Sequence, residues 1–122
     1  MIHLTKIAAA ELARYAIRVN AICPGFILTD IFTAGSGVRG AAAEVVQSEL
    51  ARSALQAQPV RKPGSPRHVA DASVFLASDE AEFITGTHLA VDGGITIGPR
   101  HSWDPDTPSP IDAARGERAA RG

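Results

Sequence analysis

Cysteine is almost missing from this sequence, and long apolar runs are missing altogether. Cys23 is the only cysteine, so the chain can form no internal disulfide and no cysteine-based zinc site. Such a composition suits a reducing, intracellular compartment. No stretch approaches the roughly 18 apolar residues that a membrane-spanning helix needs. Lys6 and Glu11 interrupt the apolar beginning, which argues against a signal peptide, and we expect a cytoplasmic protein without a membrane partner.

The sequence also lacks an excess of charge of either sign, and only 5% of its residues are aromatic. The 12 Lys and Arg nearly balance the 13 Asp and Glu, so nothing predicts a nucleic acid or an acidic membrane as a partner. The arginines of residues 115–122 are typical of a solvated segment. With 122 residues, of which 45% are hydrophobic, the chain has the composition of one globular domain with a modest core.

The order of predicted elements indicates an α/β fold. Strands separated by helical segments imply a parallel pair joined by a right-handed crossover, as in the C-terminal part of a doubly wound sheet. Such a pair alone is a poor sheet, and we expect the first strand to expose an unpaired edge. The expected elements are a helix over 2–15, a strand over 17–23, helices over 41–57 and 66–78, and a strand over 87–92.

The first predicted helix has an unusual beginning. Its apolar residues recur at helical spacing, but Met1 already lies within the pattern and no capping residue precedes it. This is typical of the later part of a helix. Glu11 falls inside the apolar stripe, where we expect it to pair with Arg18 of the next strand. The stripe consists of Leu4, Ile7, Ala8, Leu12 and Tyr15.

The two later helices differ in amphipathicity. The helix over 41–57 has one apolar face and a charged face of Glu44, Glu49 and Arg52. The helix over 66–78 is apolar on most sides, which predicts a well buried helix. Ser65 is a suitable N-cap, but His68 stands where a capping box has Glu or Gln, so we expect a weaker start. The apolar face of the former helix comprises Ala42, Val46, Leu50 and Ala54.

The end of the chain differs from the rest. From Pro99 onward, proline is frequent and large apolar residues are few. We expect residues 1–97 to form the α/β unit and residues 98–122 to form either a mobile, proline-rich tail or an arm that orders on a partner.

A Gly-x-Gly-x-x-Gly stretch lies at residues 35–40. A dinucleotide fingerprint needs a strand before the glycines, and a second strand with an acidic residue after the following helix. Asp30 interrupts the segment before the glycines, and "QPVRKPGSP" follows the helix. The stretch is therefore interpreted as a flexible loop before a helix.

Two longer segments carry a family resemblance. They are "LTKIAAAELARYAIRVNAICPGFILTD" and "RKPGSPRHVADASVFLASDEAEFITGTHLAVDGG". In order and spacing they resemble the C-terminal half of the short-chain dehydrogenases/reductases, which are Rossmann-type oxidoreductases using NAD or NADP. The resemblance implies hydride transfer between the cofactor and an alcohol or ketone, in a homo-oligomer. It does not discriminate NAD from NADP.

The resemblance assigns a site to "PGFILTD". In the family's Pro-Gly-x-x-x-Thr element, backbone groups at Pro24, Gly25 and Ile27 approach the nicotinamide end, and Thr29 offers a hydroxyl. Glycine permits close backbone approach, and threonine is a short donor. The following segment resembles the family's substrate lid, which would contain the glycines at 35–40. Phe26, Ile31 and Phe32 are expected to line an apolar substrate pocket.

The same resemblance implies that parts of the family pattern are missing. The Gly-rich cofactor turn, the catalytic Ser and the Tyr-x-x-x-Lys motif would precede Met1. Tyr15 lies about three helical turns from the expected tyrosine and has Val19 where lysine belongs. We therefore expect this chain alone to be inactive. It is either a piece of a complete enzyme, a non-catalytic module that docks on a full-length relative, or a relic that does not fold stably.

The remaining polar residues suggest structural roles. The four histidines share no metal-ligand spacing, and no metal site is expected. Asp92 begins an Asp-Gly-Gly turn, for which a structural role is expected.

Overall fold

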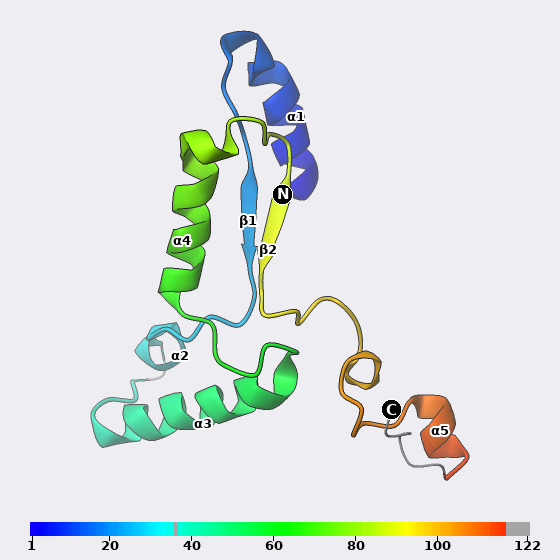
Figure 1. The fold of residues 1–122 in the computed structure, drawn as a ribbon. Helices are drawn as coiled ribbons and strands as arrows, with labels where there is room; N and C mark the ends of the chain where they lie inside the picture. Colours follow the sequence, from blue (N-terminus) through cyan, green and yellow to red (C-terminus); the bar gives the residue numbers. More distant parts are fainter. Residues whose placement is uncertain (36, 117–122) are drawn as a thin grey trace.

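The computed structural model describes residues 1–35 and 37–116. Figure 1 shows two adjacent strands with helices around them and a C-terminal segment that extends away from the strands. In chain order the elements are α1 (Ile2–Leu12), η1 (Ala13–Tyr15), β1 (Ala21–Pro24), α2 (Ile31–Ala34), α3 (Ala41–Ala57), α4 (Pro66–Ala77), η2 (Asp79–Ala81), β2 (His88–Val91), η3 (Arg100–Ser102) and α5 (Pro110–Ala114).

The two strands form a parallel pair, as predicted. The register runs from Ala21 opposite His88 to Pro24 opposite Val91. The first strand is shorter than expected, because residues 17–20 are joined to residues 84–87 mainly through side chains, with one backbone bond from the N–H of Gly86 to the carbonyl of Val19 at 2.7 Å. The backbone N–H of Val19 donates to Oγ1 of Thr85, and the carboxamide of Asn20 bridges Ile84 and Thr87. No other strand pairs with β1 in the part of the chain that the structure describes.

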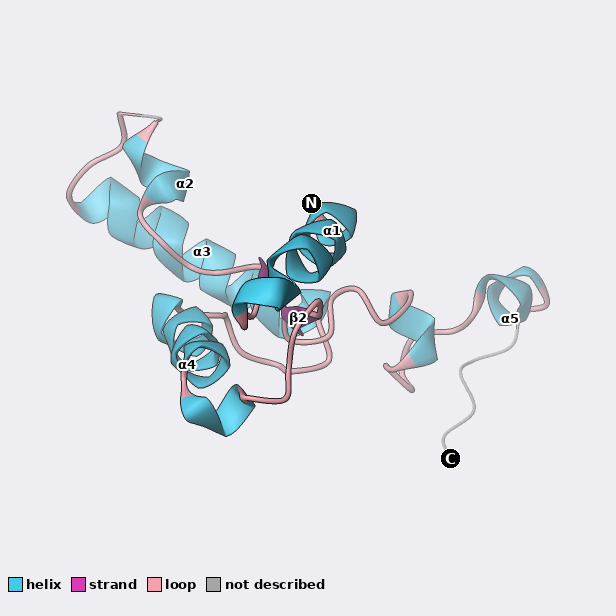
Figure 2. Ribbon diagram, turned by 90° about the horizontal axis from the view of Figure 1, so that it is seen from above, coloured by secondary structure: helices cyan, strands magenta, loops and turns pink. Residues whose placement is uncertain are grey.

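Helices α1 and α4 lie on opposite sides of the strand pair (Figure 2). The expected stripe of α1 does not form its buried face: Leu4 is 65% exposed, and Thr5 and Ala9 are buried instead. Small side chains occupy this face because α1 comes close to Gly86, where an added Cβ would lie 3.6 Å from the Cβ of Ala9. Of the α1 stripe, Leu4, Ile7 and Tyr15 are exposed, whereas Ala8 and Leu12 are half-buried.

Helix α4 begins as predicted and is better capped than expected. Ser65 is the N-cap, and its backbone N–H donates to Nδ1 of His68 at 3.0 Å, so histidine takes the place that glutamate or glutamine has in a capping box. The prediction of a well buried helix was wrong. Only Leu76 is buried, and Val74 is 70% exposed, because only one face of α4 meets the strands.

Helix α3 has the predicted bounds and mostly the predicted faces. Ala54 is buried, Val46 and Leu50 are half-buried, and the charged residues are exposed. Ala42, in the first turn, is exposed, because the helix leaves the rest of the protein there. Figure 1 shows α3 below the carboxyl ends of the strands.

Arg18 joins the C-terminal end of α4 to the strands. Its guanidinium donates to the carbonyls of Leu76 (2.8 Å), Ser78 (3.1 Å) and Ile84 (3.3 Å). These include carbonyls that the end of a helix leaves without intrahelical partners. The expected pair with Glu11 does not form, and Glu11 is exposed. A helix end offering several oxygens at once satisfies a guanidinium better than one carboxylate in solvent.

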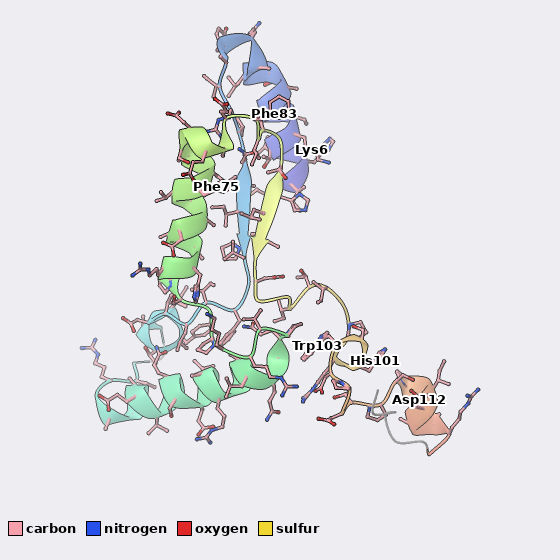
Figure 3. The ribbon with its side chains drawn as sticks, viewed as in Figure 1. Lys6, Phe75, Phe83, His101, Trp103 and Asp112 are labelled. Atoms are coloured by element: carbon pink, nitrogen blue, oxygen red, sulfur yellow. The ribbon has the colours of Figure 1, made fainter. Side chains whose placement is uncertain are left out.

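The C-terminal segment contains η3 and α5 and extends away from the strands (Figure 1). Figure 3 labels His101, Trp103 and Asp112 along it. Asp104 is buried and accepts from Nε of Arg100 at 2.7 Å, and it lies 3.6 Å from Arg61 of the loop between α3 and α4. Residues 117–122, the end of the predicted tail, lie outside the described residues. The boundary at residue 97 and the mobility of the tail stay predictions.

Candidate functional site at the carboxyl ends of the strands

The segment "PGFILT" leaves β1 at the carboxyl end of the parallel pair. Its glycine is packed against the other strand: the N–H of Gly25 donates to the carbonyl of Val91 at 3.1 Å. A Cβ on Gly25 would lie only 2.5 Å from the Cα of Asp92. Glycine is therefore needed for the close approach of two backbones, which holds the loop at this edge.

Ile27 lies at the centre of the loop, in a parallel bridge with Gly64. The carbonyl of Phe26 and the N–H of Leu28 both bond Gly64, at 3.2 and 2.9 Å. Ile27 lies between these two residues. In an extended segment, its N–H and carbonyl point away from Gly64, on the opposite side of the backbone. Accordingly, neither the N–H nor the carbonyl of Ile27 has a hydrogen-bond partner among the described residues. The loop thus presents a backbone donor and an acceptor side by side.

Thr29 ends the loop and connects it to α3. Its carbonyl accepts from Nε2 of Gln47 at 3.1 Å. Its hydroxyl makes no hydrogen bond to any residue that the structure describes. Pro24 thus ends β1, and Gly25, Ile27 and Thr29 lie along the loop that follows it, where the Ile27 backbone groups and the Thr29 hydroxyl have no hydrogen-bond partner among the described residues.

Of the three residues expected to line a substrate pocket, Phe26 belongs to this loop, and Ile31 and Phe32 follow it in α2. The rings of Phe26 and Phe32 stack with centroids 5.4 Å apart. Ile31, in the first turn of α2, is 75% exposed. The structure thus brings the two aromatic residues together and leaves the isoleucine in solvent.

The glycines at 35–40 lie between helices α2 and α3. Because no strand precedes them, they are not a dinucleotide fingerprint, as the sequence indicated. Gly37 and Gly40 have positive φ angles of 71° and 59°, which favour glycine. Ser36 lies outside the described residues, and the lid role of this segment stays a prediction.

A cavity of about 370 Å³ opens at the same edge of the strands. No pattern in the sequence predicts this cavity. Gln58, at the end of α3, lines the cavity and is only 2% exposed. A glutamine followed by proline gives no signal of burial, because its environment is made by distant segments. The other lining residues are Phe26, Ile27, Val60, Lys62, Pro63, Gly64, His68 and residues 89–94.

Asp92 has the expected structural role in the turn after β2. Its carboxylate accepts from the hydroxyl of Thr96 at 2.6 Å and from the N–H of Gly94 at 2.8 Å. These bonds, Thr96 first, hold the pKa of Asp92 below its ordinary value. The carboxylate thus stabilises the turn, in which Gly93 and Gly94 both have positive φ angles.

Few other described residues are candidates for catalysis or metal binding. Tyr15 is 60% exposed at the end of η1, far along α1 from Met1. Among residues 1–35 and 37–116, no three His, Cys, Asp or Glu side chains gather as metal ligands, and no helix is both long and apolar enough to cross a membrane.

A comparison with known families covers most of the chain, including this loop. The model of the family described as enoyl-(acyl carrier protein) reductase matches residues 1–96. This chain belongs to the short-chain dehydrogenases/reductases. The match contains both strands, helices α1 to α4 and the whole Pro-Gly-x-x-x-Thr loop, so the resemblance noted in the sequence is confirmed.

Several curated short-chain dehydrogenases/reductases are similar to this chain. The oxidoreductase UcpA of Escherichia coli K12 is 42% identical over 97 residues, which are 80% of this chain and 36% of UcpA. D-beta-hydroxybutyrate dehydrogenase of Rhizobium meliloti is 39% identical over 97 residues, 76% of this chain and 36% of that protein. The chain therefore spans about 36% of the length of these curated relatives.

Solved structures of short-chain dehydrogenases/reductases have the same fold. A 4-hydroxyisoleucine dehydrogenase complexed with NADH superposes with a TM-score of 0.64 at 33% identity, covering 80% of this chain and 37% of that one. A short-chain dehydrogenase from Leptospira borgpetersenii with bound NAD⁺ gives a TM-score of 0.58 at 32% identity, covering 78% and 32%. The parallel pair is thus part of a Rossmann-type sheet in these proteins.

Proposed function

We propose that this chain forms the nicotinamide-facing wall of an NAD- or NADP-dependent oxidoreductase that acts on a small alcohol or ketone. When bound, the cofactor would supply or accept the hydride. The chain's own contribution is to hold the nicotinamide end and to shape the substrate side. The proposal includes the expected assembly, a cytoplasmic homo-oligomer.

The backbone of Ile27 is the observation that carries this proposal. A carboxamide has one donor and one acceptor group, and the unpartnered carbonyl and N–H of Ile27 are complementary to it. The loop is anchored at Gly25, at Gly64 and through Gln47, so these groups are held in place before a ligand arrives. Ligands of open α/β sheets bind at the carboxyl ends of strands, where this loop lies.

Thr29 and the aromatic pair complete the proposed wall. The Thr29 hydroxyl can donate to the carboxamide or to a diphosphate oxygen. Phe26, Ile31 and Phe32 would exclude water on the substrate side, which strengthens polar interactions near the reacting carbon. The stacked rings of Phe26 and Phe32 supply most of this apolar surface.

The test is a titration of the isotope-labelled chain with NAD⁺, followed by backbone amide chemical shifts. We expect saturable shifts at Ile27 and Thr29. Thr29→Val should weaken binding about fivefold, because a hydrogen bond contributes roughly 1 kcal/mol. Thr87→Val is the matched control, because Thr87 precedes β2 at the opposite end of the strands. Shifts confined to other residues, or equal effects of the two variants, would contradict the proposal.

We expect binding without turnover from these 122 residues. The only tyrosine, Tyr15, is exposed and has no lysine four positions later. A chain that oxidised or reduced NAD(H) with an alcohol or ketone would overturn this expectation.

A second candidate function is that of a non-catalytic module that docks on a full-length relative. It is favoured by the unpaired edge of β1 and by exposed apolar side chains, which include Ile7 and Phe83. Phe83, labelled in Figure 3, lies between α4 and β2 and is fully exposed. Co-purification of the tagged chain with a co-expressed full-length relative is the expected result, and failure to co-purify excludes this function.

A further inference from the structure

Asp104 is a buried carboxylate that the proposed function does not use. It lies between η3 and α5, and its side chain is only 2% exposed. A carboxylate removed from water needs neighbours that neutralise it and donate hydrogen bonds to it. Its segment follows residue 96, the last residue that matches the family model, so the family pattern assigns it no role. Figure 3 shows this segment, with Trp103 labelled, next to the C-terminal end of α3.

The two oxygens of Asp104 contact different parts of the protein. Oδ2 accepts from Nε of Arg100 at 2.7 Å and from the hydroxyl of Thr107 at 3.1 Å, both in its own segment. Oδ1 accepts from the N–H of Asp106 at 3.2 Å and lies 3.6 Å from Nη2 of Arg61, in the loop between α3 and α4. The hydrogen bond from Arg100 is the main cause that holds the pKa of Asp104 below its ordinary value, so the carboxylate is ionised at neutral pH. One carboxylate thus joins the C-terminal segment to this loop.

The loop that contains Arg61 also supports the proposed nicotinamide wall. Farther along it, the N–H of Gly64 donates to the carbonyl of Phe26 at 3.2 Å, and the carbonyl of Gly64 accepts from the N–H of Leu28 at 2.9 Å. These two bonds hold the residues on either side of Ile27. A displacement of the loop would therefore displace the Ile27 backbone as well.

The connection between Arg61 and Gly64 is short and stiff. Only Lys62 and Pro63 separate them, and the proline ring restricts its own φ angle. The carbonyl of Lys62 accepts from Nε2 of Gln58 at 2.7 Å, which holds the loop from its inner side. A restraint on Arg61 therefore limits the movement of Gly64.

We propose that Asp104, acting through Arg61, is a positioning residue for the nicotinamide wall. The C-terminal segment braces the loop between α3 and α4, and this loop holds the Ile27 backbone in place. The brace itself is a property of the unliganded chain. Its effect on ligand affinity rests on the proposed function, the binding of a nicotinamide end at Ile27.

Asp104→Asn tests the brace through amide hydrogen exchange in the full, unliganded chain. The variant removes the charge that attracts Arg61 and nearly preserves the shape of the side chain. Because an ion pair with one exposed partner is weak, exchange at the Leu28 and Gly64 amides should become about threefold faster. Asp106→Asn is the matched control, since that carboxylate is exposed in the same segment and has no partner among the described residues. Its rates should equal those of the wild type.

The Gly25 amide is the internal reference for this experiment. It donates to the carbonyl of Val91 within the strand pair and does not contact the loop between α3 and α4. Its exchange rate should stay the same. Equal acceleration at Gly25 and Gly64 would mean that Asp104 only stabilises the fold as a whole, which overturns the inference.

Arg61→Met is the second variant, and it leaves Asp104 paired with Arg100. It should accelerate exchange at the same loop amides, whereas Arg61→Lys, which keeps the charge, should restore most of the protection. Arg115→Met is the matched control, because Arg115 is exposed and forms no ion pair within the part of the chain that the structure describes. Unchanged exchange in Arg61→Met would overturn the inference, whatever Asp104→Asn does.

A titration of the same variants with NAD⁺ separates the brace from the proposed function. Where the wild type binds, Arg61→Met should weaken the affinity about threefold, and an unchanged affinity would overturn the positioning role. If the wild type does not bind NAD⁺, the proposed nicotinamide wall fails. The exchange rates alone then decide whether Asp104 braces the loop.

Discussion

The two ends of the parallel strand pair are built in different ways. At the amino ends, Arg18 and Asn20 donate to the carbonyls of Leu76, Ser78 and Ile84. At the carboxyl ends, glycines bring backbones together, while Ile27 and Gln58 keep polar groups without partners among the described residues. The amino ends thus pair these side chains with backbone carbonyls, whereas the carboxyl ends leave polar groups without a partner among the described residues.

We therefore expect the amino ends of the strands to contribute mainly to stability and the carboxyl ends mainly to binding. A closed network holds elements together, whereas groups prepared for a ligand cost stability until the ligand arrives. Substitutions at the amino ends should therefore mainly change the free energy of unfolding. Side-chain substitutions at the carboxyl ends should mainly change binding, except at Gly25, which is a packing residue, and at Asp92, whose carboxylate holds the turn after β2.

Arg18→Met should have the largest effect on stability. It removes the donors to three carbonyls, and the free energy of unfolding should fall by about 3 kcal/mol. Urea denaturation measures the change. Arg67→Met is the matched control, because Arg67 is exposed on α4 and its contact with Asp71 is long, at 3.8 Å. Equal losses in the two variants would mean that the amino-end network does not stabilise the fold.

Gly25→Ala should have the next largest effect. The new Cβ would lie 2.5 Å from the backbone of Asp92, so the strands must separate locally, at a cost of about 2 kcal/mol. Gly35→Ala is the control, because no atom lies within 4 Å of the corresponding position. Thermal unfolding compares the two. If both variants unfold at the same temperature, glycine is not required for the close approach at the carboxyl end.

Asp92→Asn should have the smallest effect, at most about 1 kcal/mol at neutral pH. Because the folded-state pKa lies below the ordinary value of 3.8, the carboxylate's contribution is complete above that value. It is lost as the pH falls through the lowered pKa. The stability gap between wild type and Asp92→Asn should therefore be constant from pH 7 to near pH 4 and shrink below it.

Urea midpoints measured across this pH range test the prediction. Asp106→Asn serves as the control, since its carboxylate makes no hydrogen bond or ion pair among the described residues, and its gap should be small throughout. A gap for Asp92→Asn that widens on acidification would contradict the assigned pKa direction.

Much of the fold could be predicted because it depends on local patterns. The apolar spacing over 41–57 gave α3 its bounds, Ser65-Pro66 marked the start of α4, and the two β-rich runs marked the parallel pair. The loop after β1 was recognisable because proline, glycine and threonine recur in it at a family spacing. Its role at the nicotinamide stays a proposal.

What could not be predicted depends on contacts between distant residues. Helical spacing identified the α1 stripe but not the direction it faces, and the close approach of Gly86 decided that Thr5 and Ala9 are buried. Charge suggested Glu11 as the partner of Arg18, whereas the end of α4 supplied three carbonyls instead.

The sequence by itself determined the order of helices and strands, the parallel pairing and the family, because these follow from local periodicity and short motifs. Only the tertiary structure decided which polar groups are satisfied. Whether Arg18 or Ile27 has a partner depends on segments tens of residues away, and hydrogen bonds require those segments to meet within about 3 Å.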